Sequence, residues 1–473
     1  MNTDIPVRSG EMNRRQVLKR AMVLAIPMMI QNGLTNAVGL VDHIMVGSLG
    51  TEAMTAVSIV GQLLFVFMLA LFGGVSGPGI YTAQFFGQGN EEGVRASVRM
   101  KLIVAAIVTI VGTLVLLAGQ TQLFQLYLHG ESAEIDAELT MLHAKDYLWI
   151  MLFGLPAMAV TQVHAGTLRE TGDGVRPMSA GVVSVVVDVA LNYLLIYGSF
   201  GFPRMGVRGA AVATVIARYL EMSVLVIWTY AGKKRYAFLQ GLWRSLRIPA
   251  DLRKEMLKKT IPIMCNEFLW AAGLAALTQC YSTHGLKVVA AINISNVLCN
   301  LLNVVFVSLG ASVGILVGQS LGAGAFERAK QESFTLIWFS ALLCVGLTVV
   351  LVALSGWFPT LYETTEEVRS LAGSFIVITA LFFPVQGILN AIYFTLRSGG
   401  KTLVTFLFDS MFSWVVTIPL ALALCFLTEL PVLPVYAVIQ AVDIVKIVIG
   451  AVMIRKGVWI ANLAAGQEEE NSC

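Results

Sequence analysis

The sequence has 473 residues, of which 57% are hydrophobic and only 13% are charged. Soluble globular domains carry about 25% charged residues, so this composition excludes an ordinary soluble enzyme or binding domain. The net charge of +3 is too small to indicate a nucleic-acid partner. The apolar residues form runs of about 20, the length of a helix that crosses a bilayer, without the alternation typical of a membrane barrel.

The chain begins with a polar segment and then opens into a full spanning run, which we interpret as a retained helix and not a cleaved signal. Continuous apolar runs of this length favour helices over any other spanning structure. The sequence therefore predicts an all-α integral membrane protein with twelve transmembrane helices, at residues 21–46, 53–77, 98–119, 147–168, 177–198, 208–231, 259–282, 287–318, 333–356, 370–396, 402–427 and 432–455.

The distribution of Lys and Arg predicts the orientation, because cytoplasmic loops carry an excess of both. With the N-terminus inside, 25 of the 32 basic residues fall in inside segments and 5 in outside loops. The remaining two, Arg218 and Lys446, lie within predicted spans, away from their ends. We therefore expect a multi-pass protein of the cell (inner or plasma) membrane with cytoplasmic N- and C-termini.

An internal repeat divides the chain. A shift of 235 residues places Pro27 on Pro262 and Gly50 on Gly285, and a shift of 228 places Pro156 on Pro384. Each copy has an even number of helices, so the copies should share one orientation and be related by a pseudo-two-fold axis along the membrane normal. We predict a cytoplasmic N-terminal segment, two six-helix lobes separated by a basic cytoplasmic linker, and a cytoplasmic tail, at 1–20, 21–231, 232–258, 259–455 and 456–473.

Acidic residues inside the predicted spans indicate function, because a carboxylate at the bilayer centre costs about 2.5–3.5 kcal/mol. Two of them have a basic residue three positions away on the same helical face, Arg218 with Glu221 and Lys446 with Asp443. We interpret these two neutralised pairs as structural. The other four have no cation nearby in the sequence: Asp42, Asp188, Glu267 and Asp409.

The first half carries a candidate cation-coupling site on two predicted helices. Gln31, Thr35 and Asp42 share one stripe of the first helix, and Asp188 and Asn192 lie four apart on the fifth. Carboxylate, hydroxyl and amide oxygens suit a small hard cation, and paired acids suit a transferred proton. The alternative for Asp42 is a helix end wetted by external water.

The second half carries a candidate site for an organic cation. Glu267 lies beside Trp270 on the seventh predicted helix, and Asp409 lies at a similar depth on the eleventh. An acid beside an indole combines charge pairing with cation–π attraction. The alternative is that these polar groups join neighbouring helices. The same holds for the polar stripe of the tenth helix, formed by Gln386, Asn390 and Tyr393.

Several local motifs occur in a fixed order between about Arg15 and Leu463. They are Leu40-Val41-Asp42 followed by Val46-Gly47, Gln84 with Gly87, their copies Gln319 and Gly322, and Leu396-Arg397 before Gly399-Gly400. In this order the chain resembles the multidrug and toxic compound extrusion (MATE) family, bacterial type.

The resemblance implies a secondary active antiporter that exports amphipathic, often cationic, compounds in exchange for Na⁺ or H⁺. Two lobes would open a central cleft to alternate sides of the membrane. Asp42 matches the family's first-helix aspartate, linked to cation coupling, and Glu267 matches a seventh-helix glutamate of one branch. Some members have Asn and then Asp on the fifth helix, whereas this chain has Asp188 and then Asn192.

Three other functions remain open from the sequence: a flippase for a lipid-linked saccharide, a membrane-embedded enzyme and a channel. The small number of basic residues within spans disfavours the flippase, and no zinc or nucleotide motif supports an enzyme. We expect no cofactor and no resident metal, only a transient Na⁺ or H⁺ at Asp42 and Asp188. The expected partners are a small organic cation and the lipid bilayer, with no nucleic acid, and the expected state is a monomer.

Overall fold

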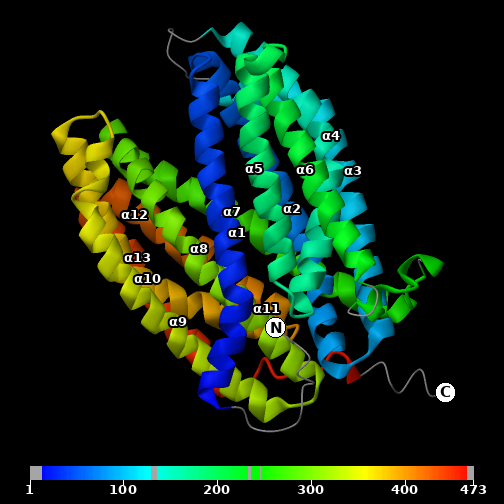
Figure 1. Cartoon of the computed structure of the whole chain (residues 1–473). Helices are drawn as coiled ribbons and strands as arrows, with labels where there is room; N and C mark the ends of the chain where they lie inside the picture. Colours follow the sequence, from blue (N-terminus) through cyan, green and yellow to red (C-terminus); the bar gives the residue numbers. More distant parts are fainter. Residues whose placement is uncertain (1–12, 129–135, 233–235, 246, 466–473) are drawn as a thin grey trace. The chain divides into compact units, whose positions relative to one another are not determined.

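The computed structural model describes residues 13–128, 136–232, 236–245 and 247–465 (Figure 1). Over these residues the regular secondary structure is helical throughout, and twelve helical stretches are long and apolar enough to cross a membrane. The predicted all-α membrane fold with twelve spans is therefore confirmed. The first six are α1 (Arg14–Gly47), α2 (Thr51–Gln88), α3 (Glu91–Leu128), α4 (Ala137–Glu170), α5 (Val175–Tyr197) and α6 (Val207–Ala231).

The second six follow a connection that contains two short 3₁₀ turns. They are α7 (Ala250–Ser282), α8 (Leu286–Gly322), α9 (Phe326–Ser355) and α10 (Glu366–Ser398), then a segmented helix and a final pair. The segmented helix consists of α11 (Thr402–Phe406), the π-helical turns η5 (Leu407–Met411) and η6 (Ser413–Thr417), and α12 (Ile418–Leu427). The final span consists of α13 (Val432–Ala441) and α14 (Asp443–Arg455).

Many helices continue beyond their apolar runs, and in α4 and α10 a polar side chain caps the extended start. Asp136 accepts hydrogen bonds from the amides of Glu138 and Leu139, which starts α4 at Ala137 and not at the predicted 147. Thr365 caps the start of α10 by accepting from the Val368 amide. The hydropathy pattern thus marks the hydrocarbon-length part of each helix and misses its capped ends.

The chain forms two compact units, each built from segments that alternate along the sequence. Unit 1 contains Met1–Met29, Ile80–Gly93 and Leu257–Cys473, and unit 2 contains Ile30–Gly79 and Val94–Met256. Helices α1, α2, α3 and α7 each contribute to both units. The start of α1 and the turn between α2 and α3 therefore fold with the second half of the sequence. The lobe boundaries from the repeat remain a prediction.

A reciprocal glycine contact joins α2 to α8 inside unit 1. A Cβ atom at Gly87 would overlap the backbone of Gln319, and a Cβ atom at Gly322 would overlap the backbone of Gln84. The two copies of the repeated Gln–Gly motif therefore pack on each other. Small residues of this kind allow helix backbones to approach closely inside a membrane.

The basic linker between the halves is partly packed onto unit 2. Tyr236 donates a hydrogen bond from its hydroxyl to Asp173 Oδ2 at 2.5 Å, and Arg99 Nε donates to the Leu242 carbonyl at 3.1 Å. Leu242 is buried, whereas Trp243 is exposed. Lys233, Lys234 and Arg235, which contribute to the predicted basic stretch, lie outside the described residues.

We expect Gly87→Ala to lower the melting temperature of the purified protein by several degrees. Overpacking of a tight contact costs about 1–3 kcal/mol, and here the obstacle is backbone that has no rotamer to change. Gly61→Ala, on the same helix, is the matched control, because a Cβ there meets no atom within 4 Å. Equal melting temperatures for the two variants would contradict the role given to the crossing.

Candidate functional site

The first-half acids form a polar cluster in unit 2, between α1 and α5. Asn192 Nδ2 donates to Asp42 Oδ1 at 2.8 Å. Asp188 has only 7% of its surface exposed and is close enough to Asp42 for the two charges to interact. Among the described residues, Oδ1 of Asp188 and Oδ1 of Asn192 are buried without a hydrogen-bond partner. Three of the five predicted coupling residues thus lie together.

Gln31 and Thr35 do not belong to this cluster. Gln31 lies eleven residues before Asp42 on α1, about 16 Å along the helix axis. Its Oε1 accepts a hydrogen bond from Arg169 Nη2 at 2.7 Å, and its amide packs on Gly181 of α5. Thr35 donates to the Gln31 carbonyl within α1 and is itself exposed. Gln31 is a poor cation ligand in this arrangement, because a guanidinium already occupies its oxygen.

Arg218 of α6 is a basic side chain that interacts electrostatically with the first-half acids. It attracts both Asp42 and Asp188, and its Nη1 lies 3.0 Å from Glu221 Oε2. Glu221 is buried. The predicted ion pair between Arg218 and Glu221 is therefore present. Two carboxylates together with this neutral pair leave an excess of negative charge when all four groups are ionised.

Helices extend over many of the basic residues predicted in cytoplasmic segments, among them Lys101, Arg169 and Arg397. Lys101 of α3 is fully buried, and it pairs with Glu170 and donates to Thr167. Arg169 and Arg397 occupy equivalent places in the repeat and lie within α4 and α10. Arg169 and Arg397 each follow directly after a predicted span, so these two helices continue past the first charge at the end of the apolar run.

In unit 1, Asn266 of α7 is the centre of a hydrogen-bond network. Its Nδ2 donates to Asp409 Oδ2 at 3.1 Å and to the Tyr393 hydroxyl at 3.3 Å. Its Oδ1 accepts from Ser410 Oγ at 2.7 Å. Trp414 Nε1 donates to the Leu269 carbonyl at 2.9 Å, which fixes the segmented helix against α7. Two of the predicted cargo residues, Asp409 and Tyr393, thus meet around Asn266.

Glu267 follows Asn266 and is half-buried. It interacts electrostatically with Arg397 and with Asp409. The Arg397 guanidinium lies over the rings of Tyr393 and Phe394, at 5.9 and 5.5 Å from their centroids. Glu267 is therefore placed among a cation, a second acid and aromatic rings.

Asp409 has no cation nearby in the sequence, but the fold brings a basic side chain to it. Lys446 Nζ of α14 lies 3.7 Å from Asp409 Oδ1 and 3.4 Å from Asp443 Oδ1. Gln386 Nε2 donates to Asp443 Oδ2 at 2.7 Å. The sequence spacing identified the pair within α14, but the contact across helices depends on the packing of α11 to α14.

The two remaining cargo candidates lie apart from these contacts. Trp270 has 43% of its surface exposed on α7. Asn390 of α10 packs on Gly310 of α8, and its buried Oδ1 has no hydrogen-bond partner among the described residues. Both side chains remain predictions as cargo contacts.

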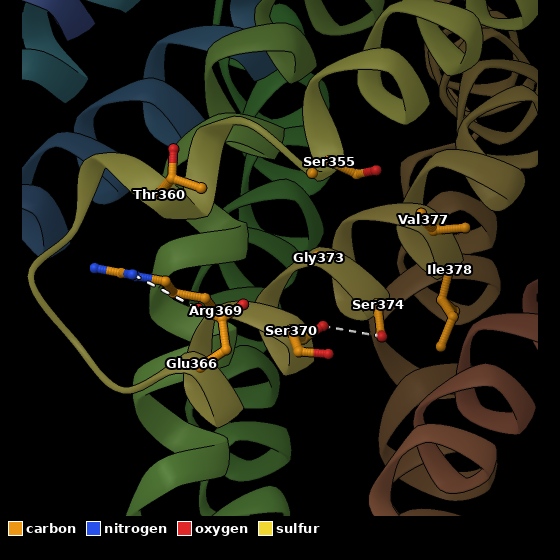
Figure 2. Close-up of a pocket in the computed structure, with 10 residues that line it drawn as sticks. Ser355, Thr360, Glu366, Arg369, Ser370, Gly373, Ser374, Val377 and Ile378 are labelled. Atoms are coloured by element: carbon orange, nitrogen blue, oxygen red, sulfur yellow. Dashed lines mark hydrogen bonds and ion pairs between the residues drawn. The ribbon is translucent and has the colours of Figure 1, made fainter.

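A surface pocket in unit 1 is separate from all predicted site residues. It has a volume of about 550 Å³ and lies where α9 connects to α10, next to Arg369, Ser370 and Ser374 (Figure 2). Arg369 donates from Nε and Nη2 to the Tyr362 carbonyl, and the close-up shows it directed toward Glu366. None of the eleven predicted site residues lines this pocket.

Comparison with known proteins decides between the transporter families. The MatE family profile matches residues 27–194 and 262–423, which is most of both repeat copies. The chain belongs to the MATE family. The members of this family are transporters, so the protein is not an enzyme.

Curated relatives cover nearly the whole chain. It is 28% identical to the "Probable multidrug resistance protein YoeA" of Bacillus subtilis, over 91% of this chain and 92% of that protein. It is 27% identical to the "Probable multidrug resistance protein NorM" of Thermotoga maritima, over 86% of this chain and 85% of that protein.

Solved structures share the fold. A crystal structure of "MATE in complex with MaL6" superposes with a TM-score of 0.84 at 20% identity, covering 97% of this chain and 99% of that chain. A MOP superfamily transporter from Pyrococcus furiosus superposes with a TM-score of 0.84 at 19% identity, covering 95% of this chain and 98% of that chain. The reverse polarity of the binding pocket of that transporter is reported to suggest a different function.

We expect Glu221→Gln to lower the amount of folded protein in the membrane, because it leaves Arg218 without its ion-pair partner. The measurement is fluorescence-detected size exclusion of a tagged protein, alongside Glu366→Gln, which removes an exposed partner of Arg369. Normal expression of Glu221→Gln together with a selective loss of transport would overturn the structural role.

Proposed function

We propose that this MATE protein is a secondary active antiporter that exports amphipathic, often cationic, compounds in exchange for Na⁺ or H⁺. The names of its relatives, which describe multidrug resistance proteins, support the cargo class. The proposal includes residence in the cell membrane with cytoplasmic termini, a monomeric state and alternating access.

One observation carries the coupling part of the proposal. Asp42 and Asp188 are close enough to interact, and an oxygen of Asp188 is buried without a partner among the described residues. A buried acceptor left unsatisfied is costly, and two neighbouring carboxylates favour uptake of a cation or a proton. Asn192, whose Oδ1 is also unsatisfied, supplies a further oxygen.

The charges in unit 1 support a cationic cargo over an anionic one. Arg397 acts on Glu267, and Lys446 lies between two carboxylates. Counting these five ionised groups gives one net negative charge. A flippase for an anionic lipid-linked saccharide would instead need basic side chains that are not already balanced by acids.

We expect Asp42→Asn and Glu267→Gln each to reduce export of ethidium from cells by about tenfold or more. Removing a charge that contacts the ion or the cargo in a low-dielectric site costs at least about 1.4 kcal/mol, which is tenfold. The measurement is the initial rate of dye efflux at matched expression. Glu138→Gln, the same chemical change at an exposed position, is the control. Normal efflux in both variants would refute the assigned roles.

The coupling ion requires a separate experiment with the purified protein in vesicles. We expect efflux of ethidium to be driven by an imposed sodium gradient or by an imposed proton gradient, and the driving gradient to lose its effect in Asp42→Asn. Dye movement that is indifferent to both gradients would refute the antiport.

A further inference from the structure

Lys446 is a buried cation in a position where an organic cation could bind. Only 9% of its side chain is exposed, and its ammonium lies 3.7 Å from Asp409 and 3.4 Å from Asp443. The same ammonium donates to Ser413 Oγ at 3.1 Å and lies 5.4 Å from the centroid of the Phe412 ring. Two carboxylates, a hydroxyl and an aromatic face thus surround one positive charge.

This surrounding has the chemistry that recognises an organic cation. Carboxylates supply charge pairing, and an aromatic face attracts cations through its quadrupole. The acids are more accessible than the lysine, with 27% of the Asp409 side chain and 18% of the Asp443 side chain exposed. Another cation can therefore approach the carboxylates while Lys446 remains covered by protein.

The backbone around Asp409 departs from a regular α-helix. Asp409 lies in the π-helical turn η5, and Ser413 begins the π-helical turn η6. Single π-helical turns are rare and frequently occur at functional sites. Ser413 donates to the Asp409 carbonyl at 3.0 Å while it accepts from Lys446, so the lysine is held to the same irregular segment as the acid.

We propose that Lys446 is an internal cation that occupies the cargo site of unit 1 and that an arriving organic cation displaces it from Asp409. When the cargo leaves, Lys446 returns to the carboxylate. The negative charge of Asp409 is compensated throughout the exchange, because either the lysine or the cargo is paired with it. This inference rests on the proposed export of cationic compounds, and it assigns Lys446 a role in cargo affinity and release.

The test compares binding of two dyes to purified protein, cationic ethidium and neutral Nile red, by fluorescence titration. Lys446→Gln removes the competitor, so we expect ethidium to bind about fivefold more tightly, the equivalent of one partly exposed ion pair. Nile red affinity should not change. Lys287→Gln is the matched control, because Lys287 forms an exposed ion pair with Glu367.

A double variant keeps the test decisive if Lys446→Gln fails to fold. Lys446→Gln with Asp443→Asn retains the net charge of the cluster and leaves Asp409 without a competitor, so it should also bind ethidium more tightly. Unchanged or weaker ethidium binding in a folded variant would overturn the inference. A wild-type protein that moves no ethidium in vesicles under either gradient would instead refute the proposed function.

Discussion

The close contact between Gly87 and Gln319, with its reciprocal contact between Gly322 and Gln84, is the constraint on which unit 1 depends. Two backbones approach there without room for a side chain, which fixes the register of α2 against α8. With the backbones fixed, Gln84 reaches the Ser398 carbonyl at 2.8 Å and accepts from the Leu463 amide at 2.7 Å. One side chain thereby links α2, α10 and the tail.

Much of the helical architecture was predictable from the sequence, because it depends on local hydropathy and charge spacing. Arg218 with Glu221 and Lys446 with Asp443 were found from their spacing of three, and both pairs are present. The contacts that define the candidate site are between helices. The Asn266 contact to Asp409 spans 143 residues, and no local pattern distinguishes it from other pairings.

Equivalent positions of the repeat carry different side chains in the two halves. Gln31 and Asn266 are equivalent under the shift of 235, and Gly181 and Asp409 under the shift of 228. In unit 2, Gln31 packs on Gly181 and binds Arg169, whereas in unit 1, Asn266 binds the acid that replaces the glycine. The basic position at Arg218 recurs as Lys446 with different acidic neighbours. The repeat therefore relates positions of the two halves, but neither the side chain nor its partner can be transferred from one copy to the other.

The end of α2 and the segment after α14 belong to one unit, which has a consequence for biosynthesis. Gln84 and the Leu463 amide that it accepts from are separated by 379 residues. At about 5–20 residues per second, a ribosome needs roughly 20–80 s to cover that distance. During this interval the end of α2 has been synthesised, whereas the backbone amide that Gln84 binds has not. The end of α2 therefore has to remain in the growing chain without this contact until translation has nearly finished.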